Sequence, residues 1–323
     1  MSGAKSSSAT ATTGTVEGAT PCRGRFAPTP SGALHFGSLV AALASWLDAR
    51  ARGGQWLVRI EDLDPPRERP GAADDILATL ESLGLHWDGP VLRQSSRHDA
   101  YDAALERLRR YGRLRECACP RTALASLPQN AQRASGDDLY HPPECVVGAG
   151  HRGGIALRFR VPDGEVEFLD RAQGAVRVNV ARSVGDFVLR RRDGLYSYQL
   201  AVVVDDEAQG ITDVVRGADL LSSTPRQVLL QDALGLRRPK YMHVPLAVDA
   251  GGLKLSKTSD APRLAGAAPA AQLAAALDFL GQEPPPDAAG AAVGDVLRWA
   301  AAHWDPARFA GSTSRATPAL ARD

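Results

Sequence analysis

One short segment, FAPTPSGALHFGSL (residues 26–39), combines a histidine with several hydroxyl side chains. Its prolines and glycines indicate a turn, and the apolar pattern that follows predicts a helix. His35, Thr29, Ser31 and Ser38 could donate hydrogen bonds to a phosphate, and a helix N-terminus favours phosphate through its free N–H groups and positive dipole end. A proline-rich turn with a capping serine would have the same composition, so this segment alone leaves both interpretations open.

A second segment whose residues could take part in a reaction is GGLKLSKTSD, residues 251–260. Glycines make such a loop mobile, and its two lysines, Lys254 and Lys257, could close over a triphosphate. By itself the pattern is also that of a solvated loop. Together, the histidine segment and the lysine segment form a specific pair, which predicts a site that binds a triphosphate and stabilises charge during a displacement at phosphorus.

The elements around the first segment form a predicted βαβ unit. A strand over residues 22–28 stops at the turn, a helix over 38–54 ends at two glycines, and a second strand covers 55–64. Such strands are parallel with a right-handed crossover, and ligands bind beyond their carboxyl ends. The turn at residues 28–37 therefore lies where a ligand is expected.

Further elements follow the same patterns. Helices are predicted over residues 74–85, 97–112, 270–281 and 293–304, strands over 200–206 and 243–248, and short strands joined by turns over 155–180. The continuous apolar run at 200–206 favours a strand covered on both faces. The predicted division of the chain is a disordered tail (1–21), an α/β domain in two parts (22–115 and 184–260), an insertion (116–183) and a helical stub with a frayed end (261–323).

Composition sets broad limits. Of the 323 residues, 44% are hydrophobic and 23% charged, with a formal net charge of +1, which is ordinary for a globular protein. No apolar run approaches the roughly 20 residues of a membrane span, and the N-terminus does not resemble a secretory signal. Four cysteines do not make a disulfide framework. We therefore expect a cytoplasmic protein without membrane contact.

The motifs resemble those of a known family. His35-Phe36-Gly37-Ser38 is similar to the HIGH signature of class I aminoacyl-tRNA synthetases, and the KLSKT segment beginning at Lys254 is similar to their KMSKS loop. RFAPTPSGALHFGSL, VRIEDLDPPR and YQLAVVVDDEAQGITDVVRGADLL resemble the glutamyl-tRNA synthetase branch, in order from about Arg23 to Asp260. HFGSL and CACP are most similar to the short paralogues of that branch. The resemblance implies an α/β, Rossmann-like catalytic domain with an inserted α+β, zinc-bearing domain and a short helical C-terminal stub.

An activity follows from the same resemblance. Only about 65 residues follow Thr258, too few for the large anticodon-binding region of a full glutamyl-tRNA synthetase. The short paralogues activate L-glutamate with ATP and Mg²⁺, without tRNA, and transfer it to the queuosine base at the wobble position of tRNA(Asp). The implied partners are ATP, L-glutamate and queuosine-containing tRNA(Asp), and we expect a monomer.

The family's functional residues map onto positions of this chain. Glu61 would bind the α-ammonium group of glutamate, while Arg25 and Arg216 would each take a carboxylate, in an order that the sequence does not decide. The implied glutamate-binding set is Arg25, Ala27, Thr29, Glu61, Tyr198 and Arg216. The implied ATP-binding set is Pro28, His35, Gly37, Ser38, Lys254, Ser256 and Lys257, and the catalytic residues are His35, Lys254 and Lys257. The family signature ends in histidine where this chain has Ser38, so a second imidazole at the phosphates is absent from the motif.

A zinc site is implied in the insertion. In the family, Cys, Cys, Tyr and Cys bind one structural zinc ion, with a Y-x₃-C spacing. Here Cys117, Cys119 and Cys145 supply the cysteines, and Tyr140 is the implied fourth ligand. This chain reads Y-x₄-C, and His141 has the x₃ spacing, so His141 is a rival ligand. Three reduced cysteines without metal are the alternative.

Other functions remain open at this stage. The chain could be a truncated glutamyl-tRNA synthetase that charges a tRNA 3′ end, an adenylyltransferase acting on a small molecule, or a non-catalytic paralogue that binds tRNA or an amino acid. The intact His35, Lys254 and Lys257 argue against the last. Arginine clusters at residues 107–115 and 190–192 could contact a phosphate backbone or be solvated faces.

Overall fold

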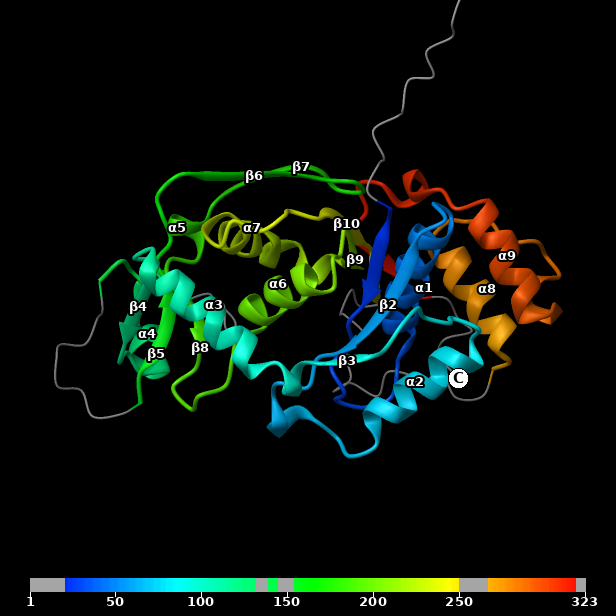
Figure 1. Ribbon diagram of the computed structural model, residues 1–323. Helices are drawn as coiled ribbons and strands as arrows, with labels where there is room; N and C mark the ends of the chain where they lie inside the picture. Colours follow the sequence, from blue (N-terminus) through cyan, green and yellow to red (C-terminus); the bar gives the residue numbers. More distant parts are fainter. Residues whose placement is uncertain (1–20, 132–138, 145–153, 250–266, 318–323) are drawn as a thin grey trace, which may run out of the picture.

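The computed structural model describes residues 21–131, 139–144, 154–249 and 267–317 (Figure 1). Several predictions fall outside these ranges: the disordered tail, the frayed C-terminus, the fourth cysteine (Cys145) and the lysine segment with Lys254, Ser256 and Lys257. No helix of the described ranges is long and apolar enough to cross a bilayer.

The predicted βαβ unit is confirmed. Strand β1 (Arg23–Phe26), helix α1 (Phe36–Arg50) and strand β2 (Gln55–Ile60) follow one another, and β1 pairs in parallel with β2. A two-residue strand, β3 (Leu92–Arg93), extends the sheet beyond β2. Gly54 directly precedes β2 and lies beside the residue before β1, where any side chain would overlap the backbone of Cys22. Alternate residues of β2 are fully buried beneath α1, which explains the strand pattern in the sequence.

A second group of parallel strands lies next to β1. Strand β9 (Asp213–Gly217) pairs in parallel with β10 (Lys240–Val244). The backbone N–H of Thr212, just before β9, donates to the carbonyl of Arg23 at 3.0 Å, so β9 starts beside β1. The carboxyl ends of β1, β2, β9 and β10 therefore open toward one side of the molecule, as the predicted fold requires.

The strand predicted over residues 200–206 is wrong, because this segment forms helix α6 (Tyr198–Ala208). Ser197 caps the helix by accepting a hydrogen bond from the N–H of Leu200 at 3.4 Å. Its apolar residues are buried between α3 (His98–Arg110) and α7 (Thr224–Ala233). A continuous apolar run marks burial on all sides, and a buried helix satisfies it as well as a buried strand.

The strand predicted over residues 243–248 is interrupted at Pro245, which has no N–H to donate. The first half belongs to β10, whereas the second is β11 (Leu246–Val248), which pairs with β12 (Ser314–Ala316). The remaining predicted helices are confirmed as α2 (Ala72–Ser82), α3, α8 (Pro269–Phe279) and α9 (Val293–Ala302). Helices α8 and α9 pack beside α1 at one end of the molecule (Figure 1). Short 3₁₀ helices cover Pro65–Arg67, Gln94–Ser96, Pro128–Asn130, Ala218–Ser223, Ala288–Gly290 and Pro306–Phe309.

The short strands predicted over residues 155–180 are confirmed, in two different sheets. Strands β4 (Leu114–Cys117), β5 (Ala156–Phe159) and β8 (Phe187–Arg190) form an antiparallel sheet at the far end of the molecule. The hairpin β6 (Glu165–Asp170) and β7 (Gly174–Asn179) instead runs back along one side, and Asp170 pairs with Tyr241 of β10 (Figure 1). Two short helices, α4 (Arg121–Ala125) and α5 (Val180–Ser183), complete this region. The predicted domain boundaries stay predictions.

Candidate active site

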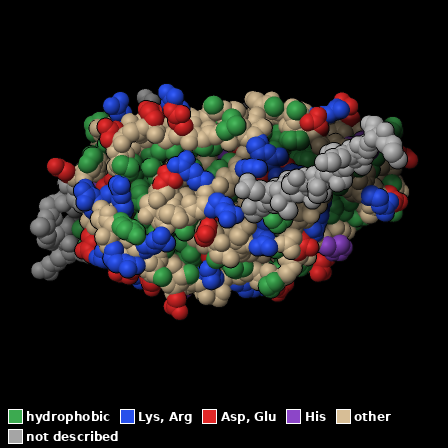
Figure 2. Space-filling model, turned by 45° about the horizontal axis from the view of Figure 1, so that its top comes forward, with side chains coloured by type: hydrophobic (Ala, Val, Ile, Leu, Met, Phe, Trp, Pro, Cys, Tyr) green, Lys and Arg blue, Asp and Glu red, His purple; other side chains and the backbone are tan. Residues whose placement is uncertain are grey.

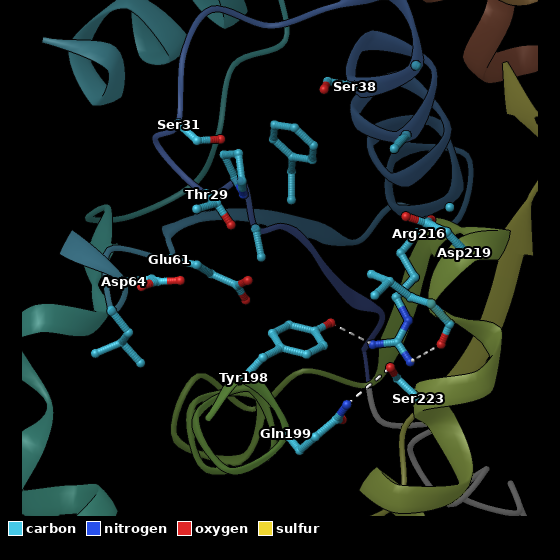
Figure 3. A pocket seen from close by; sticks show the side chains of 18 of the residues that line it. Thr29, Ser31, Ser38, Glu61, Asp64, Tyr198, Gln199, Arg216, Asp219 and Ser223 are labelled. Carbon is cyan, nitrogen blue, oxygen red and sulfur yellow. Dashed lines mark hydrogen bonds between the residues drawn. The ribbon is translucent and has the colours of Figure 1, made fainter. Parts of the chain in front are cut away.

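A cavity of about 660 Å³ opens at the carboxyl ends of the parallel strands, large enough for a small-molecule ligand. It brings together all the predicted glutamate- and ATP-binding residues that the structure describes. These are Arg25, Ala27, Pro28, Thr29, His35, Gly37, Ser38, Glu61, Tyr198 and Arg216. Figure 3 shows Glu61 and Thr29 on one side of this space, with Tyr198 and Arg216 on the other.

At the phosphate end, His35 is itself the N-cap of α1. Its Nδ1 accepts a hydrogen bond from the backbone N–H of Ser38 at 3.3 Å, so the cap is a histidine and not the serine of the alternative interpretation. With Nδ1 accepting, the proton of the neutral ring lies on Nε2, where it can donate to a phosphate oxygen. A side chain at Gly37 would come within 3.1 Å of the His35 ring, so a larger residue here would require the imidazole to shift.

Arg25 is held by an acid that the sequence analysis missed. Asp206 of α6 accepts from Arg25 Nε at 3.1 Å and from its Nη2 at 3.3 Å, and also from Arg59 Nη2 at 2.8 Å. All three side chains are buried. Burial would raise the pKa of Asp206, but the two guanidinium groups lower it below its ordinary value. Asp206 therefore stays ionised and fixes Arg25 at the end of β1.

Glu61 lies directly after β2, almost completely buried, with 10% of its side chain exposed. Its nearest cation among the described residues is Arg59, whose Nη2 is 3.7 Å away. Within the described part of the chain, Glu61 Oε1 accepts no hydrogen bond. Burial raises the pKa of Glu61 to about 7, although Arg59 and Arg25 oppose the shift. A buried carboxylate that lacks a donor and lines the cavity could receive a ligand's ammonium group.

Arg216 enters from the end of β9, 5% exposed. Its Nη1 donates to the Tyr198 hydroxyl at 3.1 Å, and its Nη2 donates to Thr224 Oγ1 at 2.8 Å (Figure 3 shows the first of these). Its guanidinium also lies over the ring of Tyr241, 5.4 Å from the centroid. Among the residues that the structure describes, no carboxylate comes within 4.0 Å of it. A buried cation with only neutral partners could bind a ligand's carboxylate.

The predicted metal site is partly visible. Cys117, Cys119 and His141 are buried, and their ligand atoms lie within 4.8 Å of one another, with Cys117 Sγ 3.1 Å from His141 Nε2. Burial would raise the pKa of the Cys117 thiol, but the hydrogen bonds with His141 and the Cys119 N–H lower it to about 6. Neither cysteine forms a disulfide. Two thiolates and an imidazole are a usual zinc donor set, so these residues fit the metal.

The structure thus brings the rival ligand His141 to the two cysteines. The Nδ1 atom of His141 is buried without a hydrogen-bond partner in the described residues. Tyr140 is half-buried, and both its backbone N–H and its carbonyl bond to Asn130. Its role as a ligand stays a prediction, and Cys145 lies outside the described residues. None of the three clustered residues lines the cavity, so the cluster is separate from it.

The two arginine clusters differ in their surroundings. Arg109 and Arg110 are exposed on α3, whereas Arg115 forms an ion pair with Asp186 at 3.1 Å. Arg191 lines the cavity. On the face shown in Figure 2, basic side chains lie among acidic ones rather than in one continuous band. Contact of these clusters with tRNA stays a prediction.

The class of protein follows from the fold and this cavity. Residues 21–263 match the family "tRNA synthetases class I (E and Q), catalytic domain". Two solved glutamate–tRNA synthetases, from Elizabethkingia anophelis and Elizabethkingia meningosepticum, superpose with TM-scores of 0.77 and 0.76 at 26% sequence identity. They cover 93% of this chain, which spans 69% and 68% of theirs.

More similar relatives are shorter. A glutamyl-Q tRNA(Asp) synthetase of Pseudomonas aeruginosa is 56% identical over 287 residues, covering 88% of this chain and 94% of the relative. One from Dechloromonas aromatica is 55% identical with the same coverage, and one from Ectopseudomonas mendocina is 52% identical over 92% of this chain and 98% of the relative. The chain belongs to the glutamyl-Q tRNA(Asp) synthetase family. The members of this family are ligases of the class I tRNA synthetase type.

Proposed function

We propose that this protein activates L-glutamate with ATP to glutamyl-adenylate, without tRNA, and transfers glutamate to the queuosine base at the wobble position of tRNA(Asp). One observation carries the choice of amino acid. The cavity holds a buried carboxylate without a donor, Glu61, and a buried guanidinium without an acid partner among the described residues, Arg216. An amino acid with an ammonium group and an additional carboxylate complements both.

The first step is an in-line displacement at phosphorus. An α-carboxylate oxygen of glutamate attacks the α-phosphorus of ATP, the bond to the bridging oxygen breaks, and pyrophosphate leaves. Mg²⁺ accompanies ATP and neutralises phosphate charge. His35 Nε2 and the N-terminus of α1 stabilise the charge that develops on the phosphates. Lys254 and Lys257 are proposed to do so from the opposite side, with Ser256, Pro28, Gly37 and Ser38 as further ATP contacts.

In the glutamate pocket, Glu61 holds the α-ammonium group, and Ala27 and Thr29 line the site. The two arginines differ in a way that supports separate roles. Arg25 already donates two hydrogen bonds to Asp206. Its guanidinium is therefore fixed in place, and part of its charge is neutralised. Among the described residues, Arg216 contacts only neutral acceptors, and it is proposed to bind the side-chain carboxylate, with Tyr198 beside it. Glutamine would leave that buried cation without a counter-charge.

In the second step, a nucleophile of the queuosine base attacks the activated carbonyl, and AMP leaves. A structural zinc ion is proposed at Cys117, Cys119 and His141, with Cys145 and Tyr140 as candidates for the remaining position. When bound, it would fix the region between β4 and β5 and take no part in the chemistry. The tRNA substrate implies a cytoplasmic location, and we expect a monomer.

The test is glutamate-dependent ATP–pyrophosphate exchange without tRNA, followed by transfer of radiolabelled glutamate to tRNA(Asp) with and without queuosine. Exchange together with transfer only to the queuosine-bearing tRNA is the expected result. Transfer to the 3′ end of tRNA(Glu) would instead identify a truncated glutamyl-tRNA synthetase. Absence of exchange with every amino acid would indicate a non-catalytic binding paralogue.

A further inference from the structure

A further hydrogen bond of Arg216 lies behind the cavity. Its Nε donates to Nε2 of His243 in β10, 3.0 Å away. The other ring nitrogen of His243, Nδ1, is 2.5 Å from Oδ2 of Asp170 at the end of β6. His243 is completely buried, Asp170 is 1% exposed, and neither lines the cavity. A chain of hydrogen bonds thus runs from the β6–β7 hairpin through β10 to the proposed glutamate-binding arginine.

The direction of these bonds is set by chemistry. An arginine Nε–H can only donate, so His243 Nε2 must accept and carry no proton. The second neighbour of Nε2, Thr224 Oγ1 at 3.3 Å, is compatible with the same assignment. The ring proton therefore lies on Nδ1 and is donated to Asp170. Burial and the charge of Arg216 lower the pKa of His243, against the opposing effect of Asp170, which agrees with a neutral ring.

Asp170 is in turn fixed by its surroundings. Its Oδ1 accepts from the backbone N–H groups of Ala172, Gln173 and His243, at 3.0, 2.9 and 3.2 Å. These bonds orient the carboxylate so that Oδ2 faces the imidazole. They also lower the pKa of Asp170, together with His243, although burial acts in the opposite direction. Asp170 therefore has one oxygen committed to the hairpin and one to His243.

We propose that His243 and Asp170 are positioning residues that hold the guanidinium of Arg216 in the orientation that binds the side-chain carboxylate of glutamate, and so set both affinity for glutamate and rejection of glutamine. The proposal rests on the proposed role of Arg216. Nε is the one guanidinium donor on the side of the aliphatic chain. Its bond to His243 therefore restricts rotation of the guanidinium about the long axis of the side chain. Asp170 selects the tautomer of His243 that can accept from Arg216.

Two substitutions at one position separate positioning from packing. His243→Gln places an amide oxygen near the former Nε2 and can still accept from Arg216. His243→Asn is matched in chemistry but shorter, so its amide reaches only Asp170. Asp170→Asn turns an NH₂ group toward Nδ1, which forces the ring proton onto Nε2 and sets two donors against each other at Arg216.

The readouts are KM for glutamate, KM for ATP and kcat in pyrophosphate exchange, with thermal unfolding as a control. We expect His243→Asn and Asp170→Asn to raise the glutamate KM about tenfold or more, the usual effect of losing a hydrogen bond to a charged group, and to reduce discrimination against glutamine. His243→Gln should stay within about threefold of the wild type. The ATP KM should stay unchanged in all three variants.

A glutamate KM equal to that of the wild type in all variants would overturn the proposal. A rise in the KM for both glutamate and ATP together with a loss of thermal stability would also overturn it. A second measurement is independent of activity: ¹⁵N NMR of histidine-labelled wild-type protein should show His243 protonated at Nδ1, and Asp170→Asn should move the proton to Nε2. Protonation at Nε2 in the wild type would also overturn it. If the wild type lacks exchange but shows the Nδ1 proton, the proposed function fails while the positioning geometry stands.

Discussion

The glutamate affinity of this protein should depend on pH through Glu61. Only the ionised carboxylate pairs with the ammonium group of the substrate, and burial raises the pKa of Glu61 to about 7. The charged groups that face it are Arg59 and Arg25, which lower this pKa, and Asp206 and Asp205, which raise it. Glutamate binding must therefore drive a proton off Glu61 whenever the pH lies below that value.

The magnitude follows from the same pKa. With a pKa of about 7, about nine-tenths of Glu61 is ionised at pH 8 and about one-tenth at pH 6. The glutamate KM at pH 6 should therefore be about tenfold higher than at pH 8. The carboxyl groups of the substrate titrate well below this range and its ammonium group well above it. The change in KM therefore comes from a group of the enzyme.

The assay is pyrophosphate exchange with varied glutamate, at saturating ATP, over this pH range. Glu61→Gln is the matched control, since it keeps the shape of the side chain and cannot ionise. Its glutamate KM should be high and independent of pH. A wild-type KM that does not change, or a Glu61→Gln variant that keeps the wild-type slope, would refute the assignment of the titration to Glu61.

Stability provides a second check on the same variant. The pKa of Glu61 is higher in the folded protein than its ordinary value of 4.5. The folded state therefore becomes less stable as the pH rises from 4.5 to about 7. At pH 8 the buried charge costs up to about 3 kcal/mol, which Glu61→Gln removes. The variant should therefore unfold at the same temperature as the wild type or higher, while its glutamate KM is raised.

Three further perturbations test other parts of the structure. Arg216→Ala should raise the glutamate KM in pyrophosphate exchange about 10- to 100-fold and let glutamine compete, since a charged hydrogen-bond partner is lost; unchanged discrimination would contradict its role. Asp206→Asn leaves two buried guanidinium groups with less counter-charge, so denaturant unfolding should show a loss of about 3–5 kcal/mol. His141→Ala should lower the zinc content measured by atomic absorption and the unfolding temperature, whereas Tyr140→Phe should retain zinc; zinc loss in the tyrosine variant alone would reverse the ligand assignment.

Local patterns in the sequence were sufficient for the βαβ unit and most helices. The strand alternation of residues 55–60 and the glycines before it are short-range signals, and they hold in the structure. The error at residues 200–206 has a physical origin. A segment buried on all sides has no polar face, so the spacing of its apolar residues does not distinguish a helix from a strand. The cap formed by Ser197 was the local signal for a helix.

The missed site residues share another property. Asp206 lies 181 positions from its partner Arg25, and Asp170 lies 73 positions from His243. Polar residues such as Arg59, within an apolar strand, signal a buried partner, but a single sequence does not say which one. The resemblance identified residues that line the cavity, whereas the groups behind them depend on how β6, β9 and β10 are paired.

The two arginines of the cavity show why an imidazole stands between Asp170 and Arg216. Asp206 contacts Arg25 directly and neutralises much of its charge, which fixes the side chain but leaves less attraction for a ligand. At Arg216 a direct carboxylate would compete with the carboxylate of glutamate for the same guanidinium. His243 instead offers a neutral acceptor, whose strength is increased by its own bond to Asp170. Arg216 is thereby held in place while its full positive charge stays available, which is the condition for preferring glutamate over the uncharged glutamine.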